Sequence, residues 1–199
     1  MVGIPVIDTG PMTVEEFYAF TDTRPDEEKW ELIEGEPILN AASSPMHQFI
    51  VRNVVVALTI REREFKAPWA VLPGLGLRVS NTDRPEPDVI VIPSDHLSLS
   101  PRERHTSRVI VAFEILSPLT EGRDLRWKRT AYTSLPSLTH YIVIAQDAVE
   151  VIVFARDAGF AEERIRSVGK AIELRSLGIS LPVAEIYRDT RLVEIAWAF

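Results

Sequence analysis

The sequence predicts a domain of the α/β or α+β class, in which helices flank a mixed β-sheet. Two observations carry this prediction. A long stretch with helical apolar spacing precedes a run of short, β-branched apolar stretches, and a second helical stretch separates two of the most apolar ones. The 199 residues fit a single domain, 1–199, because neither an internal repeat nor a long linker divides the chain.

The first third of the chain predicts a short helix, a hairpin and a long helix. Thr13 and Glu16 form a capping-box pattern at the start of the short helix. Residues 29–41 contain two short strands about a turn. Ser44 is the expected N-cap of the long helix, because Pro45 suits the first helical position. The apolar residues expected on the buried face of this helix are Ile50, Val54, Ala57 and Leu58.

The rest of the chain predicts several strands and one further long helix. A strand at 109–116, a helix from about 121 to 134 and a strand at 140–145 suit a parallel crossover unit, because parallel neighbours need such a connection. Alternation over 170–187 indicates one or two more strands and a short terminal helix. The other expected strands are 75–79, 88–92 and 149–154.

Composition narrows the classes of function. With 46% apolar and 26% charged residues, and no apolar run near the roughly 20 residues that span a bilayer, a cytoplasmic globular protein without a signal peptide is expected. The lack of cysteine excludes disulfides and thiolate metal sites. The net charge of −7 argues against non-specific coating of nucleic acid. It leaves room for a metal-dependent enzyme, because a bound metal reverses the sign of a carboxylate-rich site.

Two acidic residues belong to strands that should be buried. Both faces of the strand at 109–116 are apolar apart from Glu114, so this strand should be central and covered on both sides. A buried, ionised glutamate is unfavourable unless it is paired or binds a metal. Asp88 begins the other strongly apolar strand, and two converging carboxylates suit a hard divalent cation. Taken alone, Glu114 fits a salt bridge to an arginine, and Asp88 fits a turn or cap after Pro87.

The helix after the strand of Glu114 carries a cation in a suitable place. Asp124, Lys128 and Tyr132 are spaced four residues apart and share one helical face. Ala131 and Leu135 lie close to that face, which indicates that it turns partly inward. A lysine there would bring its ammonium to the two acids. The alternative is an ordinary Asp–Lys pair on the surface.

Taken in order, these residues resemble the restriction-endonuclease-like superfamily, whose signature is Pro-Asp, a spacer, then (Asp/Glu)-x-Lys. The chain is more closely similar to the Uma-type endonuclease family within it. The lysine position of the wider signature is Leu116 here, whereas the closer family places its lysine on the following helix, which maps to Lys128. The matching segments are "WELIEGE" (30–36), "SSPMHQFI" (43–50), "PEPDVIV" (85–91), "VAFEILSP" (111–118), "RDLRWKRTAY" (123–132), "THYIVI" (139–144) and "LRSLGISLP" (174–182).

The resemblance implies a restriction-endonuclease-like core and metal-dependent hydrolysis of phosphodiester bonds, with DNA as the expected partner. Asp88 and Glu114, with the backbone carbonyl of Ile115, would hold Mg²⁺ or Mn²⁺, which would activate water and stabilise charge on the phosphate. Lys128 would orient or help to deprotonate the water, or neutralise the developing charge.

Four further residues have supporting roles in this interpretation. Asp124 would steer the ammonium of Lys128, and Tyr132 would pack or hydrogen-bond behind it. His47 would contact a phosphate or a metal-bound water, with a capping or core histidine as the alternative. Glu31 would be a third acid near the metal, with an exposed strand residue as the alternative.

Two questions stay open at the level of sequence. The terminal "EIAWAF" (194–199) would indicate a homodimer contact if exposed, whereas a tail folded onto its own core is the alternative. A non-catalytic nucleic-acid-binding or regulatory protein that retains the fold is the alternative function. The complete acid–acid–lysine set favours the enzyme, because a protein without turnover has no physical need to keep mutually repelling acids. The lack of a Gly-x-Ser-x-Gly turn and of a His-x-x-x-His pair argues against other hydrolase classes.

Overall fold

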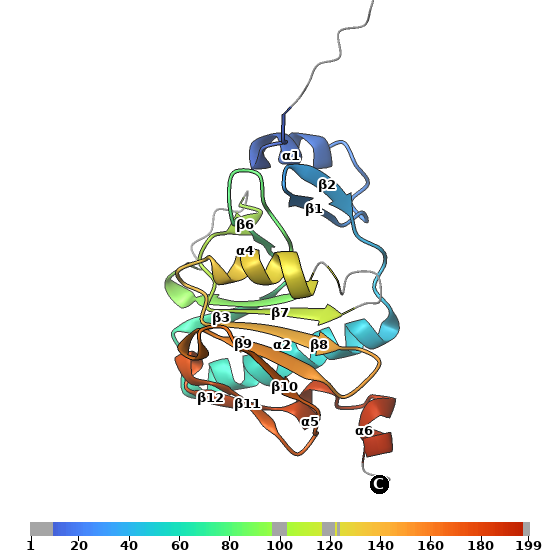
Figure 1. Cartoon of the computed structure of the whole chain (residues 1–199), viewed down its shortest axis with the longest axis vertical. Helices are drawn as coiled ribbons and strands as arrows, with labels where there is room; N and C mark the ends of the chain where they lie inside the picture. Colours follow the sequence, from blue (N-terminus) through green and yellow to red (C-terminus); the bar gives the residue numbers. More distant parts are fainter. Residues whose placement is uncertain (1–9, 97–102, 117–121, 123, 197–199) are drawn as a thin grey trace, which may run out of the picture.

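A mixed six-stranded sheet forms the centre of the computed structural model (Figure 1). From one edge to the other its strands are β10 (Glu162–Ile165), β9 (Val151–Ala155), β8 (His140–Ala145), β7 (Val111–Leu116), β5 (Val89–Pro93) and β3 (Trp69–Pro73). β7 and β8 are parallel, as predicted, and the other neighbours are antiparallel. The structure describes residues 10–96, 103–116, 122 and 124–196, without the side chains of His96, Asp124 and residues 194–196.

One face of the sheet is covered by the long helix α2 (Pro45–Phe65). Ser44 caps it, as predicted, because its side chain accepts a hydrogen bond from the backbone N–H of His47. The four apolar residues expected on the buried face are all in the core cluster on this side. The hairpin of β11 (Ala171–Leu174) and β12 (Ile179–Pro182) and the short helix α5 (Val183–Ile186) also pack here.

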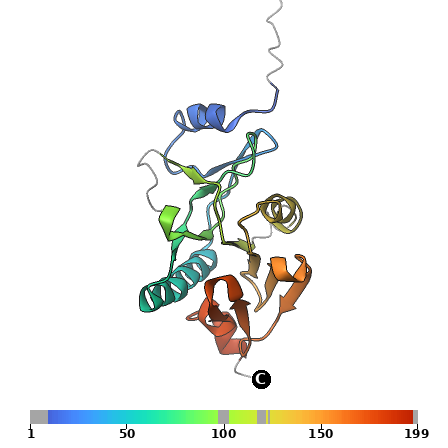
Figure 2. The same cartoon turned by 90° about the vertical axis from the view of Figure 1, so that its left-hand side faces the viewer.

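The opposite face is covered by a π-helical turn, Asp124–Lys128, which continues into α4 (Arg129–Thr133) (Figure 2). The predicted helix is therefore present, although its first described turn is wider than an α-helical one. Lys128 and Tyr132 both point inward, as predicted, and the Tyr132 ring packs edge-on against Tyr141 with ring centroids 5.1 Å apart. The strand acid Glu114 lies on this face of the sheet.

A third, smaller layer lies at the top of Figure 1, on the α4 side of the sheet. It contains α1 (Val14–Thr21), whose predicted capping box is formed, and the predicted hairpin of β1 (Trp30–Ile33) and β2 (Glu36–Leu39). Backbone hydrogen bonds between Leu32 and Arg84 attach this hairpin to the segment that leads into β5. The layer therefore closes over one end of the sheet.

Three strands, β3, β6 (His105–Thr106) and β10, escaped the sequence analysis, and one expected strand was too long. β3 and β10 are the two edges of the sheet, and β10 is largely exposed and polar. The expected strand at 75–79 is reduced to β4 (Gly76–Leu77), which pairs with β6. The remaining elements are α6 (Arg191–Ala196) and 3₁₀ turns at Ser94–His96, Arg156–Ala158 and Arg175–Leu177.

No helix in the described ranges has the length and apolar character needed to cross a bilayer. The terminal "EIAWAF" segment was expected either as a dimer contact or as part of the core. The side chains of residues 194–199 lie outside the described part of the chain, so this expectation stays a prediction.

Candidate active site

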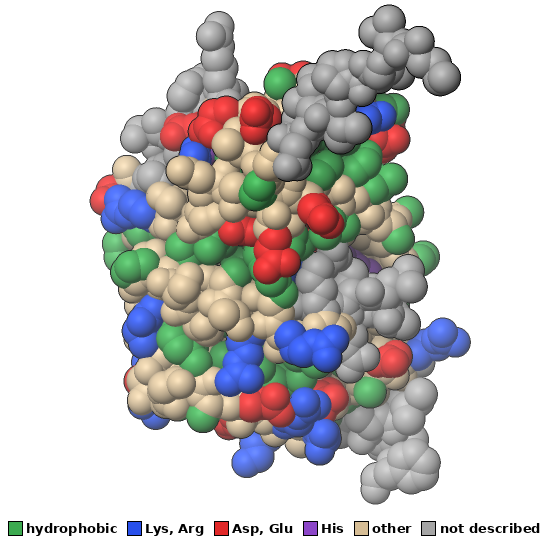
Figure 3. All heavy atoms as spheres, turned by 45° about the horizontal axis from the view of Figure 1, so that its top comes forward, with side chains coloured by type: hydrophobic (Ala, Val, Ile, Leu, Met, Phe, Trp, Pro, Cys, Tyr) green, Lys and Arg blue, Asp and Glu red, His purple; other side chains and the backbone are tan. Residues whose placement is uncertain are grey.

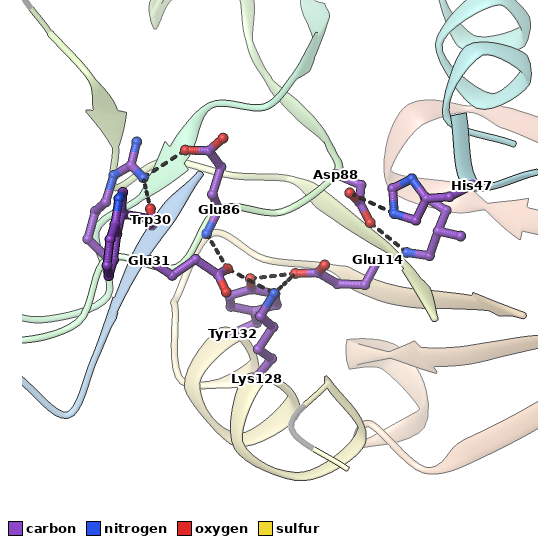
Figure 4. Close-up of polar contacts among 10 residues, drawn as sticks. Trp30, Glu31, His47, Glu86, Asp88, Glu114, Lys128 and Tyr132 are labelled. Atoms are coloured by element: carbon purple, nitrogen blue, oxygen red, sulfur yellow. Dashed lines mark hydrogen bonds and ion pairs between the residues drawn. The ribbon is translucent and has the colours of Figure 1, made fainter. Parts of the chain in front are cut away.

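A pocket of about 560 Å³ opens where β7 and β8 end, between the β1–β2 hairpin and the first turn of α2. Four of the seven residues singled out from the sequence line this pocket: His47, Asp88, Glu114 and Lys128. Glu31 and Tyr132 contact these residues from behind (Figure 4). The side chain of Asp124 lies outside the description, so its predicted role is open.

Lys128 is held between two acids in the wall of the pocket. Its Nζ lies 2.9 Å from Glu31 Oε1 and 2.9 Å from Glu114 Oε1, and the residue is only 3% exposed. The helix thus carries the ammonium to the strand acid, as the spacing of the sequence predicts. The alternative of a surface pair is wrong for this lysine.

Glu31 is fully buried, so the alternative of an exposed strand residue is wrong. The hairpin is covered by the segment that contains Arg84, which pairs with Leu32, the neighbour of Glu31. The local pattern of β1 cannot show this cover, since it comes from a distant part of the chain. Glu31 Oε1 also accepts a hydrogen bond from the backbone N–H of Glu86 at 2.7 Å.

Tyr132 binds the strand acid, Glu114. Its hydroxyl donates to Glu114 Oε1 at 2.7 Å. Burial raises the pKa of Tyr132 well above its usual value, and the carboxylates of Glu114 and Glu31 raise it further. The hydroxyl therefore stays protonated and acts as a donor, so that Glu114 receives both the tyrosine hydroxyl and the lysine ammonium.

Asp88 has partners different from those of Glu114. It comes one residue before β5, and its Oδ2 accepts a hydrogen bond of 2.8 Å from the backbone N–H of Ile115. Its Oδ1 lies 3.2 Å from Nε2 of His47, in the first turn of α2. His47 is a buried histidine whose side chain contacts an acid of the pocket, and its predicted role at a phosphate or a metal-bound water stays a prediction. Nδ1 of this histidine is buried without a hydrogen-bond partner in the described part of the chain.

The two acids are neighbours across the strands. Val89 pairs with Phe113, so the register continued by one residue places Asp88 opposite Glu114. Asp88 faces His47 and the Ile115 amide, whereas Glu114 faces Lys128 and Tyr132 (Figure 4).

Within the described residues, no three His, Cys, Asp or Glu side chains form a ready-made metal cluster. A pair of carboxylates fits Mg²⁺ better than a closed protein cage would, because this ion keeps several waters and takes phosphate oxygens as ligands.

Sequence reasoning missed two residues of the pocket. Glu86 was missed because it holds Glu31 through its backbone N–H, which leaves no trace in side-chain patterning. Gln146 directly follows β8, and its Oε1 accepts a hydrogen bond of 2.5 Å from the hydroxyl of Ser44. A signal for Gln146 was present, since polar residues after parallel strands meet at the same edge of a sheet.

Comparison with known proteins agrees with this architecture. A crystal structure from Anabaena variabilis, described as that of a putative nuclease belonging to DUF820, superposes with a TM-score of 0.72 over 88% of this chain and 97% of its own, at 16% identity. That likeness concerns the fold. The uncharacterized protein slr1290 of Synechocystis sp. is 30% identical over 101 residues, so the match spans 48% of this chain and 53% of that protein. The Uma2 family, described as putative restriction endonuclease, matches residues 14–184, and the chain belongs to this family.

Proposed function

We propose that this protein is a metal-dependent endonuclease that hydrolyses phosphodiester bonds in DNA. The observation that carries the proposal is the buried Lys128 ammonium, 2.9 Å from Glu114, in the wall of a pocket that Asp88 also lines. The printed description of the Uma2 family supports the same class of reaction.

Each residue of the site has a definite task in this proposal. Asp88 and Glu114, with the carbonyl of Ile115, would hold Mg²⁺ or Mn²⁺, which supplies activation of water and neutralisation of phosphate charge. Lys128 orients the attacking water and stabilises the charge that develops on the phosphate. His47 keeps the Asp88 carboxylate aimed at the pocket.

The cost of the site supports an active role. A buried ion cluster contributes little to stability compared with well-packed apolar residues, so stability alone does not explain Lys128 and its two acids. Among the described side chains of this cluster, three acids, Glu31, Asp88 and Glu114, lie near one lysine, Lys128, which gives a formal excess of negative charge. This local excess of negative charge suits a divalent cation.

The alternative is a nucleic-acid-binding or regulatory protein without turnover. Such a protein would rely on a broad basic surface. Figure 3 shows acidic and basic side chains interspersed on the face that contains the N-terminal layer, without a continuous basic band among the described residues. The overall charge of −7 points the same way. The observations therefore favour catalysis at a local site.

The test is cleavage of plasmid DNA, and separately of RNA, with Mg²⁺ or Mn²⁺. Asp88→Asn and Glu114→Gln should abolish cleavage with unchanged circular dichroism, because each removes a ligand charge at nearly constant volume. Asp157→Asn and Glu163→Gln are matched controls on the exposed surface, and both should cleave like the wild type. Wild-type protein that binds DNA without cleaving it would favour the alternative. Cleavage by either site variant, in a preparation free of contaminating nuclease, would sink the proposal.

A further inference from the structure

Arg84 is a buried charged residue to which the proposed chemistry gives no task. Its side chain is 8% exposed. Nη1 lies 2.7 Å from Glu86 Oε2 and 3.4 Å from the carbonyl oxygen of Trp30, and Nη2 lies 2.8 Å from the carbonyl oxygen of Arg104. Nε is buried and has no hydrogen-bond partner in the part of the chain that the structure describes. A buried donor without a partner lowers stability, so stability alone explains this arginine poorly.

Arg84 contacts the residues that precede and follow Glu31 in the chain, and also the residue whose amide binds the Glu31 carboxylate. Its side chain binds the carbonyl of Trp30, the residue before Glu31. Its backbone exchanges two hydrogen bonds, of 2.8 and 3.1 Å, with Leu32, the residue after Glu31. Its guanidinium pairs with the carboxylate of Glu86. The backbone N–H of Glu86 donates to the carboxylate of Glu31, and both residues are labelled in Figure 4. Arg84 thus holds both chain neighbours of Glu31. It also holds Glu86, the residue whose amide binds the Glu31 carboxylate.

Gly76 provides the space for this arrangement. A Cβ at this position would lie 2.1 Å from Arg84 Nε and 2.2 Å from Cζ, far inside van der Waals contact. The φ angle of Gly76 is not positive, so alanine would cause no backbone strain here. The expected effect of Gly76→Ala is therefore the steric clash between the added methyl group and Arg84. Gly76→Ala therefore displaces the guanidinium without changing any charge.

We infer that Arg84 is a positioning residue: it fixes Glu31 against Lys128 and thereby sets the direction of the Lys128 ammonium. The catalytic consequence rests on the proposed function, whereas the placement of the ammonium does not. Lysine would not replace Arg84, because a single ammonium lacks the planar fork that reaches three acceptors at once.

The first test measures the placement of Lys128 directly. Native protein is acetylated with acetic anhydride, and modification of Lys128 is quantified by mass spectrometry relative to Lys29, an exposed lysine at the same pocket. In Arg84→Leu and Gly76→Ala we expect Lys128 to react about tenfold faster or more, because a buried amine reacts only when its surroundings open. Gly76→Ala keeps the test decisive if Arg84→Leu does not fold.

Two matched controls separate this effect from general loosening. Arg61→Leu breaks a bidentate pair with Glu185 between α2 and α5, and Gly169→Ala adds a methyl group that meets only Ser167 at 3.7 Å. Neither should change the reactivity of Lys128. An unchanged rate in folded Gly76→Ala protein, or an equal increase in the controls, would overturn the inference.

The second test uses DNA cleavage. Gly76→Ala should lower kcat by roughly tenfold to a hundredfold with little change in KM, since small misplacement of a catalytic group has costs of this size. In a Glu31→Gln background, Gly76→Ala should cause no further loss, because the group through which Arg84 acts is already changed. Independent losses in the two variants would count against positioning through Glu31. If the wild type cleaves nothing, the proposed function fails, while the acetylation rates still decide whether Arg84 places Lys128.

Discussion

Replacing Lys128 with methionine should destabilise the protein by about 3–5 kcal/mol at neutral pH, the usual cost of removing one partner from a buried ion pair. Methionine keeps an unbranched apolar stem but removes the ammonium. The lysine side chain is 4% exposed, and those of Glu31 and Glu114 are 1% and 5% exposed, so solvent screens their charges weakly. The variant keeps two buried carboxylates and lacks the ammonium that lies between them.

The same reasoning predicts whether a second substitution, Glu31→Gln, raises or lowers the free energy of unfolding. Adding Glu31→Gln to Lys128→Met should restore roughly 1–3 kcal/mol, because it removes one of the two repelling carboxylates. In the wild-type background, Glu31→Gln should destabilise instead, since Lys128 then loses one of its acids. The opposite signs in the two backgrounds are the signature of a charge-coupled cluster.

Urea unfolding at pH 7.5, analysed by linear extrapolation, measures these differences. Lys170→Met, at an exposed lysine, is the matched control and should stay within about 0.5 kcal/mol of the wild type. A loss below about 1 kcal/mol for Lys128→Met would refute the reasoning, because such a value is typical of exposed pairs. Further destabilisation by Glu31→Gln in the Lys128→Met background would refute it as well.

Three other outcomes are expected. Tyr132→Phe should cost about 1–3 kcal/mol in urea unfolding, because Glu114 loses a buried donor. Lys128→Ala should lose cleavage yet retain Mn²⁺ binding in calorimetry, since the proposed ligands remain; loss of both would contradict the division of roles. Burial and two nearby arginines lower the pKa of His105, so protonation favours the unfolded state, whose histidine titrates near 6.5. The contribution of His105 to stability should therefore be level above about pH 6.5 and fall below it, and His105→Gln should reduce the loss of stability between pH 7.5 and 5.5.

The parts of the site that were predictable from sequence depend on local spacing. Glu114 interrupts a strand that is apolar on both faces, and this pattern predicted both its burial and the central place of β7. Lys128 shares a helical face with Tyr132, and the apolar residues Ala131 and Leu135 close to that face predicted that it turns partly inward, with a surface pair as the alternative. Strand and helix periodicities determine which face a side chain occupies, so such predictions need no distant contact.

The parts that were not predictable depend on contacts across layers. The burial of Glu31 results from the docking of the hairpin onto the Arg84 segment, and neither stretch contains a sign of the other. The pairing of Asp88 with His47 likewise joins the residue before β5 to the first turn of α2. The edge strands β3 and β10 lack the alternation or the β-branched run that marks a strand. An edge strand pairs with a neighbour on one side only, so its sequence is less constrained than that of a central strand.

The pocket is assembled from segments that are far apart along the chain: the contact between Ser44 and Gln146 spans 102 positions, and that between Glu31 and Glu86 spans 55. Contacts of such separation form slowly during folding, because the entropy of closing a long loop is lost before the contact compensates it. Lys128 meets both of its acids only when hairpin, strand and helix have all docked. A growing or partly folded chain therefore lacks the assembled pocket, and pulse-labelled hydrogen exchange should show the β1–β2 amides gaining protection after those of β7 and β8.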